Sequence, residues 1–348
     1  MEASEIDKLE EELQNKFSRI KERTKVLNLF RILSYGGSIL YFLGVFIGTN
    51  ILAYTYSEWF SQIDNMTILY MIIPLFVLIT IGSAGTSYYY SKYIQTEQEA
   101  LQSIIKVIFP TATYSLDKGK FSISRLMLSG LFGNVERDKI TAYSLGALQT
   151  IQNNQRIVIN DISITNSRWV YWLSKSSIGV FLIVIIYMIR GIFAKRIEDI
   201  TTDFRGMFST VPLNKNIEGI VIIVPDRLEK QIDYLAENIQ KLKNRNGINL
   251  VKMENVDFEY EFSVYASDDI LARYILTPAR MRKIVELKNK YGRDIMLSYA
   301  FNQFYAAVNL PEGLLGLDNK KIIDGNSVHS FYNNVCMSQT IMSELSNV

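Results

Sequence analysis

Two long stretches near the start of the chain contain no charged residue. No Asp, Glu, Lys or Arg occurs between Arg31 and Glu58, and none occurs between Asp64 and Lys92. Each stretch exceeds the roughly 20 apolar residues that an α-helix needs to cross a hydrocarbon core of about 30 Å. The pattern therefore predicts a hairpin of two transmembrane helices within residues 31–91.

The segment before this hairpin, residues 1–30, carries one apolar stripe. Apolar side chains recur there every three or four positions, at Ile6, Leu9, Leu13, Phe17 and Ile20. This spacing predicts an amphipathic helix. Two interpretations stay open: the stripe pairs with a second chain as a short coiled coil, or it lies on the chain's own cytoplasmic domain or on the lipid headgroups.

Residues 92–348 alternate between strand and helix patterns. Predicted strands lie within Arg156–Thr165, Phe204–Val211, Ile220–Val224, Leu250–Met253 and Phe258–Tyr265, followed by a hairpin of Ile295–Tyr299 and Gln303–Val308. Predicted helices include Gln95–Phe109, Phe121–Leu131, one that starts at Asp226 and extends through Leu242, a pair broken at Thr277–Pro278, and Ser330–Leu345. Short strands interspersed with helices indicate an α+β fold with a mostly antiparallel or mixed sheet.

An apolar insertion at residues 168–196 interrupts this pattern. Its uncharged core, Ser176–Ile189, is shorter than a typical membrane span. A single crossing would also place the strands before and after it on opposite sides of the bilayer. We therefore favour a segment that docks on or re-enters the membrane, with a third span and a buried core helix as the alternatives. The side chains assigned to membrane contact are Trp169, Trp172, Ile178, Phe181, Ile185 and Phe193.

Glycines mark a candidate contact between the two predicted spans. They are Gly37, Gly44 and Gly48 on the first span and Gly82 and Gly85 on the second. Small residues let two membrane helices approach closely. A short loop keeps the entropy cost of bringing the two helices together low. The alternative is that glycine is simply common in membrane helices.

The distribution of basic residues predicts the topology. Lys and Arg are frequent before the first span and reappear after the second, whereas the loop between the spans carries Glu58 and Asp64 and no basic residue. The basic excess places both termini in the cytoplasm. The multi-pass chain then has most of its mass, residues 92–348, on the cytoplasmic side.

Composition excludes several classes of function. The formal net charge of +2 gives no general attraction to nucleic acid. With one cysteine (Cys336) and one histidine (His329), the chain cannot form an internal disulfide or a Cys/His metal cluster. We therefore predict no cofactor, no metal site and no catalytic residue.

Two groups of charged residues lie at or on the predicted helices after Ser267. Asp268 and Asp269 follow Ser267, so we interpret Ser267 as a helix N-cap and the two acids as first-turn residues that favour the helix dipole. A basic run on the next helices includes Arg280, Arg282 and Lys283. These three are candidate contacts for anionic lipid, and a solvated helix face is the alternative.

Three stretches of the cytoplasmic region resemble a known family. They read IFPTATYSLDKGKFSISRLMLSGLF, DFRGMFSTVPLNKNIEGIVIIVPD and FEYEFSVYASDDILARYILTPARMRKIVELKNKYG. They are similar to the bacterial membrane family catalogued as domain of unknown function 3137. The resemblance implies two N-terminal spans and a cytoplasmic domain, in the inner membrane of a bacterium, and implies no activity.

The sequence is most consistent with a membrane-anchored cytoplasmic scaffold or protein-interaction domain that is not an enzyme. Its expected partners are the lipid bilayer and a protein, either a second copy of the chain or another membrane protein. A component of a membrane transport complex and an unrecognised membrane-associated enzyme are the alternatives.

Overall fold

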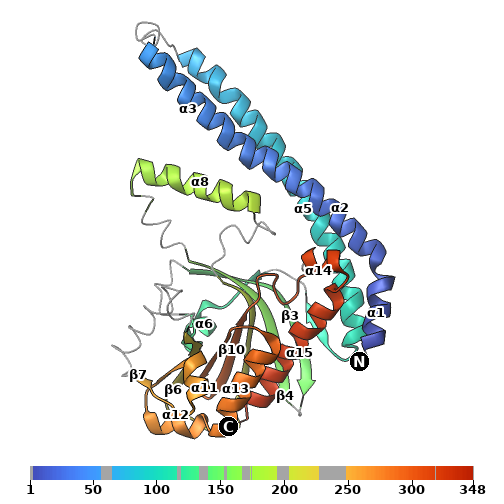
Figure 1. Cartoon of the computed structure of the whole chain (residues 1–348), viewed down its shortest axis with the longest axis vertical. Coiled ribbons are helices and arrows are strands. Elements are labelled where there is room, and N and C mark those ends of the chain that lie inside the picture. Colours follow the sequence, from blue (N-terminus) through green and yellow to red (C-terminus); the bar gives the residue numbers. More distant parts are fainter. Residues whose placement is uncertain are drawn as a thin grey trace. The chain divides into compact units, whose positions relative to one another are not determined.

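The computed structural model describes residues 3–55, 65–115, 119–132, 140–152, 155–166, 173, 175–193, 204–226, 248–317 and 319–347. The chain forms two compact units (Figure 1). The α+β unit comprises Met1–Glu11, Leu101–Ser167 and Thr202–Val348. The helical unit comprises Glu12–Ala100 and Arg168–Thr201, so it includes the apolar insertion.

The helical unit is built from long helices. Helix α2 (Gln14–Arg31) continues through a π-helical turn, η1 (Ile32–Gly36), into α3 (Gly37–Thr55). Within the described ranges, Gln14–Val45 is the one helix that is long and apolar enough to cross a membrane. The finding supports one of the two predicted spans, and the second remains a prediction.

Helix α5 (Asn65–Ile108) is one continuous helix of 44 residues, about 66 Å long at 1.5 Å per residue. The helix expected at Gln95–Phe109 is therefore not a separate element but the last part of α5, which ends just before Pro110. Lys16 and Arg23 of α2 donate to the backbone carbonyls of Glu99 (3.2 Å) and Lys92 (2.5 Å) on α5. Basic side chains of α2 thus link the two helices outside the charge-free stretches.

The α+β unit contains one sheet in which every pair of neighbouring strands is antiparallel. Its described strands are β1 (Thr113–Ser115), β2 (Gly119–Lys120), β3 (Ile140–Gln152), β4 (Gln155–Asn166), β5 (Phe204–Pro212), β6 (Ile220–Pro225), β7 (Asn249–Val251), β8 (Phe262–Ala266), β9 (Ile295–Ala300) and β10 (Gln303–Asn309). The order is β1-β3-β4-β5-β10-β9-β6-β8-β7, with β2 paired to β3. The predicted α+β fold with a mostly antiparallel sheet is confirmed.

Both faces of the central strands are buried. Because successive side chains of a strand point to opposite faces, Met296 and Ala300 enter a different core from Tyr299. The first core is covered by α6 (Ile123–Ser129) together with Leu131 and Phe132. On the other face the Tyr299 hydroxyl donates to the backbone carbonyl of Leu345 at 2.8 Å.

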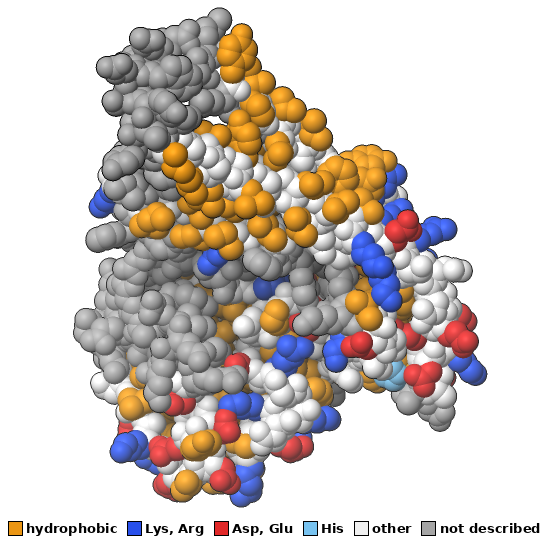
Figure 2. Space-filling model, turned by 45° about the horizontal axis from the view of Figure 1, so that its top comes forward, with side chains coloured by type: hydrophobic (Ala, Val, Ile, Leu, Met, Phe, Trp, Pro, Cys, Tyr) orange, Lys and Arg blue, Asp and Glu red, His pale blue; other side chains and the backbone are white. Residues whose placement is uncertain are grey.

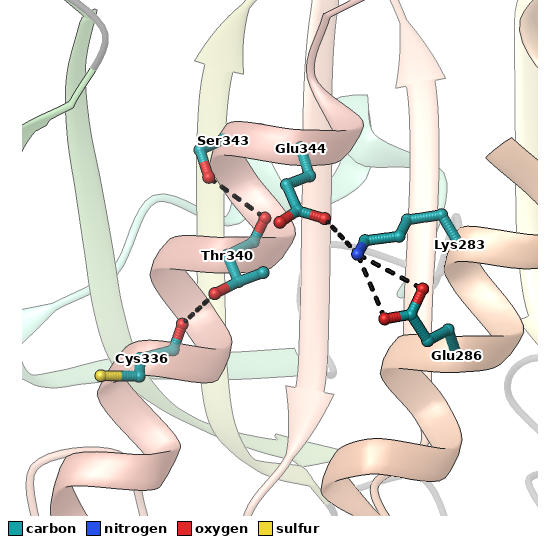
Figure 3. Close-up of polar contacts among 6 residues, drawn as sticks. All are labelled: Lys283, Glu286, Cys336, Thr340, Ser343 and Glu344. Carbon is teal, nitrogen blue, oxygen red and sulfur yellow. Dashed lines mark hydrogen bonds and ion pairs between the residues drawn. The ribbon is translucent and has the colours of Figure 1, made fainter. Parts of the chain in front are cut away.

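The helices outside the first core are mostly short. They are α1 (Ala3–Glu12), α11 (Val256–Glu261), α12 (Asp269–Ile275), α13 (Pro278–Tyr291), α14 (Asn319–Asp324) and α15 (Ser327–Leu345). Helices α13 and α15 contact each other and run side by side in front of the sheet (Figure 3). They present apolar side chains, such as Ile284 and Ile341, that are fully buried.

Local sequence signals placed several elements correctly. The β9–β10 hairpin turns at Phe301 and Asn302, which both adopt positive φ angles of 51° and 59°. Helix α13 starts after Thr277, whose side chain accepts from the Arg280 N–H, and ends at Gly292 in the left-handed conformation. The predicted hairpin strands agree with β9 and β10 to within one residue, and the predicted break at Thr277–Pro278 is the start of α13.

Other elements differ from the predictions. Residues 256–261 form helix α11 rather than the start of a strand, because Asn255 caps the helix by accepting from the Phe258 N–H at 3.0 Å. One helical turn brings Phe258 and Phe262 into a stacked pair with ring centroids 5.2 Å apart. The long strand β3 was not predicted, and the helix expected after Asp226 lies outside the described residues.

A buried ion pair joins the middle strands to the loop that follows β10. Asp161 on β4 is fully buried and lies 3.5 Å from Nε of Arg205 on β5. The other carboxylate oxygen of Asp161 accepts from the Leu315 N–H at 2.9 Å. Gly313, with φ of +82°, passes so close that a Cβ there would lie 2.8 Å from Asp161 Oδ2. The charged pair thus holds this loop against the sheet.

We predict that Asp161→Asn lowers the free energy of unfolding by about 3–5 kcal/mol, because it removes a buried carboxylate from beside the buried Arg205 guanidinium. Thermal unfolding of the full chain in detergent would measure the loss. Asp257→Asn, at an exposed acid on α11, is the matched control and should change stability by less than about 0.5 kcal/mol. An equal effect of the two substitutions would contradict a structural role for the pair.

Candidate functional site

A carboxylate from the start of the chain caps the last helix. Glu10 on α1 is 4% exposed, and its two carboxylate oxygens accept from the N–H groups of Ser327 (2.9 Å) and Val328 (2.7 Å). Asn326, the residue at the N-cap position of α15, makes no side-chain capping bond. Glu10 therefore supplies both the hydrogen bonds and the negative charge that the N-terminus of a helix favours.

A second contact joins the same two helices. Asp7, one turn before Glu10, lies with Oδ1 2.8 Å from Nε2 of His329. Asp7 is exposed and His329 is half-buried, so solvent weakens this contact relative to the Glu10 cap. We call the pair of contacts, Glu10 to the α15 N-terminus and Asp7 to His329, the Glu10 clasp.

Beside the clasp lies a cavity of about 550 Å³, the α13–α15 cavity. It is bounded by the end of α13, by α14 and by the first turns of α15. Its lining is polar and rich in nitrogen: Lys290, Tyr291, Arg293, Lys321, Asn326, His329, Ser330, Asn333 and Asn334. The fold thus gathers side chains from three helices around one space.

The positive charges of this lining are only partly compensated. Arg293 is paired with the carboxylate of Glu312 at 2.7 Å, and that carboxylate also accepts from Asn334 at 3.3 Å. His329 has Asp7 as its partner. Lys290 and Lys321, in contrast, form no ion pair with any residue that the structure describes. Two full positive charges therefore remain available at the cavity.

The basic run identified in the sequence is largely neutralised within the fold. Lys283 lies 3.0 Å from Glu344 and 3.3 Å from Glu286 (Figure 3), and the hydrogen bond to Glu344 raises its pKa. Arg280 donates to the backbone carbonyls of Ile275 and Asn347. Of the three candidate lipid contacts, Arg282 is exposed and has no ion pair in the described part of the chain.

The paired aspartates act within a strand–helix connection. Asp268, not Ser267, is the N-cap of α12, and its carboxylate accepts from the Ile270 N–H at 3.1 Å. Ser267 instead exchanges hydrogen bonds with the backbone of Ile220 on β6, each 3.0 Å long. Because the Ser267 hydroxyl accepts from the Ile220 N–H, the next residue, Asp268, caps the helix instead.

The single cysteine lies between exposed and buried. Burial raises the pKa of the Cys336 thiol, and a hydrogen bond to Tyr332 partly offsets this effect. The Thr340 hydroxyl, one turn after Cys336, donates to the backbone carbonyl of Cys336 (Figure 3). This is an ordinary contact within α15. Groups of three or more His, Cys, Asp or Glu residues able to hold a metal ion do not occur within the described ranges.

Three of the five glycines assigned to helix packing lie in close contact with the other helix, and two do not. A Cβ at Gly82 would collide with Ser34 and one at Gly85 with Phe30, while a Cβ at Gly37 would lie 3.3 Å from Leu78. These pairs run in opposite directions along the two helices, as antiparallel packing requires. At Gly44 and Gly48 a Cβ would meet nothing within 4 Å.

The apolar insertion contains helix α8 (Ser177–Phe193). Its main contacts are with η1 and α2: a Cβ at Gly191 would lie 2.7 Å from the Tyr35 ring, and one at Gly36 would lie 3.9 Å from Ile192. Of the six predicted membrane-contacting residues, Ile178, Ile185, Phe181 and Phe193 belong to α8, and Ile185 is half-buried. Trp169 and Trp172 lie outside the described residues.

Sequence reasoning missed the Glu10 clasp and the α13–α15 cavity. Neither Glu10 nor Lys290 was among the predicted site residues. No local signal pointed to the clasp: Asn is a common helix N-cap, and only the folded structure shows that the Asn326 side chain makes no capping bond.

Comparison with known proteins gives one match. The family model "Protein of unknown function (DUF3137)" matches residues 202–347, which confirms the resemblance. The matched region contains strands β5 to β10 and every residue that lines the α13–α15 cavity. No curated protein and no solved structure matches the chain.

We predict that Glu10→Ala lowers stability by about 1–3 kcal/mol, because two buried N–H groups lose their acceptor. Amide hydrogen exchange should accelerate at Ser327 and Val328 in the same variant. The matched control is Glu11→Ala, at an exposed glutamate next to Glu10 on α1. Unchanged exchange at the start of α15 would show that Glu10 does not cap this helix in solution.

Proposed function

We propose that this protein is a membrane-anchored cytoplasmic scaffold, in which the helical unit holds the α+β unit at the bilayer and the α+β unit binds a protein partner. The observation that carries the proposal is the exposed apolar surface of the helical unit. Large side chains such as Leu40, Phe76 and Ile81 are more than half exposed there. An exposed apolar surface of this extent is typical of a site that meets lipid or another protein.

This surface follows the predicted membrane hairpin. Exposed side chains occur along α2, η1 and α3, at Leu29, Ile32, Leu33, Leu40, Leu43, Ile47 and Ile51, and along α5, at Tyr70, Ile73, Phe76, Val77, Ile79 and Ile81. Figure 2 shows a broad hydrophobic surface with few charged side chains within it. We propose that both α3 and the first part of α5 cross the bilayer, with both termini in the cytoplasm.

Helix α8 fits the role of a membrane-surface segment. It has 17 residues, so its length of about 26 Å falls short of the hydrocarbon thickness. Val180, Leu182, Val184 and Ile189 on α8 are exposed. Its contacts with η1 join it to the hairpin near Arg31, where the charge-free stretch begins. We therefore propose that α8 lies in the headgroup region or dips into one leaflet.

The α+β unit carries a second exposed apolar surface, which suits a protein partner. Val256 and Tyr260 of α11 are 81% and 83% exposed, and Ile270 of α12 is 77% exposed. Arg273 of α12 contacts the segment just before α11: it donates to the backbone carbonyl of Lys252 at 3.1 Å and pairs with Glu254 at 3.3 Å. Isolated exposed apolar residues are ordinary, whereas three on neighbouring short helices favour a binding surface.

Cysteine labelling tests the topology. In a full chain without Cys336, we predict that Ser61→Cys reacts with an impermeant maleimide in intact cells and that Asn309→Cys reacts only after the membrane is opened. Asn309 is exposed at the end of β10, so protection by the fold does not explain a lack of labelling. Labelling of position 309 from outside would place the α+β unit on the wrong side and end the scaffold proposal in this form.

Charge placed on the α11–α12 surface tests the partner. We predict that Val256→Lys with Ile270→Lys leaves the chain folded, since both side chains are exposed, and abolishes co-purification of proteins that accompany the wild type in mild detergent. Asp269→Asn is the control: it should lower stability by no more than about 1 kcal/mol and keep the complex. Partners retained by the double variant would move the binding surface elsewhere.

A further inference from the structure

We propose that the α13–α15 cavity binds a phosphate group carried on a small hydroxylated molecule. The inference goes beyond the scaffold function and does not depend on the membrane topology, because every residue it uses belongs to the α+β unit. Its starting point is the pair of lysines, Lys290 and Lys321, that face the cavity without an acid partner in the described part of the chain.

Three neighbouring basic residues, unlike these two lysines, have acid partners. Along α13 and just after it, Lys283 has Glu286 and Glu344, Lys288 has Glu261, and Arg293 has Glu312. Lys290 and Lys321, which both line the cavity, have no acid partner among the residues that the structure describes. Lys290 also lies 5.2 Å from the centroid of the Tyr291 ring, a weak interaction that leaves its charge intact. Two ammonium groups match the charge of a phosphate monoester.

The size and polarity of the cavity define the rest of the ligand. A volume of about 550 Å³ lies within the roughly 300–1,000 Å³ of small-molecule sites and exceeds what a bare phosphate fills. The remaining wall is formed by Asn326, Ser330 and Asn333, whose amide and hydroxyl groups both donate and accept hydrogen bonds. Such groups suit hydroxyls, and they disfavour an acyl chain. A glycerol phosphate group satisfies both requirements.

This chemistry has two sources, a soluble phosphorylated metabolite and the headgroup of a phospholipid. The test uses the full-length chain in an uncharged detergent at fixed ionic strength. Glycerol 3-phosphate represents the soluble source, and short-chain phosphatidylglycerol represents the lipid source. Glycerol and short-chain phosphatidylcholine serve as ligand controls. Binding is measured by calorimetric titration and by the shift in unfolding temperature.

The decisive variant is Lys290→Gln with Lys321→Gln, which removes both unpaired charges. Its matched control is Arg282→Gln, which removes an exposed and unpaired charge from the same helix, outside the cavity. We expect the double variant to raise Kd by at least about tenfold, since charge-assisted hydrogen bonds are lost, and the control to bind as the wild type does. Lys321→Gln alone, at an exposed position on the short α14, gives a second variant if the double variant unfolds.

Each outcome decides the proposal. Lysine-dependent binding of glycerol 3-phosphate supports a soluble ligand, and lysine-dependent binding of phosphatidylglycerol alone supports a lipid headgroup. Binding that is equal in all variants, or that falls equally in Arg282→Gln, would show a general attraction to anions and overturn the site. Absence of binding by both probes to the wild-type chain would overturn it as well.

Discussion

The N-terminus of the last helix of the α+β unit, α15, is capped by one buried carboxylate, that of Glu10. Helix α15 buries ten of its residues and covers one face of the sheet, so its position fixes the core beneath it. A helix needs acceptors for its first N–H groups, and here they come from a residue more than three hundred positions earlier in the chain. The same bond ties the first helix of the chain, α1, to its last helix, α15.

The parts of this fold that follow from local rules could be predicted, and the parts that depend on distant partners could not. The β9–β10 turn and the limits of α13 depend on residues within a few positions, namely Phe301, Asn302, Thr277 and Gly292. The apolar stripe of Ile6 to Ile20 was also visible, and its burial within the same chain favours packing on the chain itself over a coiled coil between chains. Strand β3 escaped prediction because its alternation is interrupted by the bulge between Ser144 and Gly146.

The same distinction explains why the candidate site was missed. In the sequence, Lys283, Lys288, Lys290 and Arg293 look alike, as bases on one helix and its end. Apart from Glu286 on α13 itself, their acids lie on other elements: Glu344 on α15, Glu261 on α11 and Glu312 after β10. Only the folded arrangement shows that Lys290 has no acid partner among the described residues. A count of charges along the chain, or a net charge of +2, averages over this difference.

The Glu10 clasp uses the first backbone N–H groups of α15, while side chains of the same turns line the α13–α15 cavity. This arrangement limits how the cavity can bind an anion. Anion sites at helix N-termini use free backbone N–H groups and the helix dipole. In α15 the first two of these N–H groups already bind Glu10, and a carboxylate at that place repels further negative charge. An anion in the cavity must therefore rely on side-chain cations, and Lys290 and Lys321 are those without a carboxylate partner among the described residues. The lysines, rather than the helix terminus, are consequently the groups on which affinity depends.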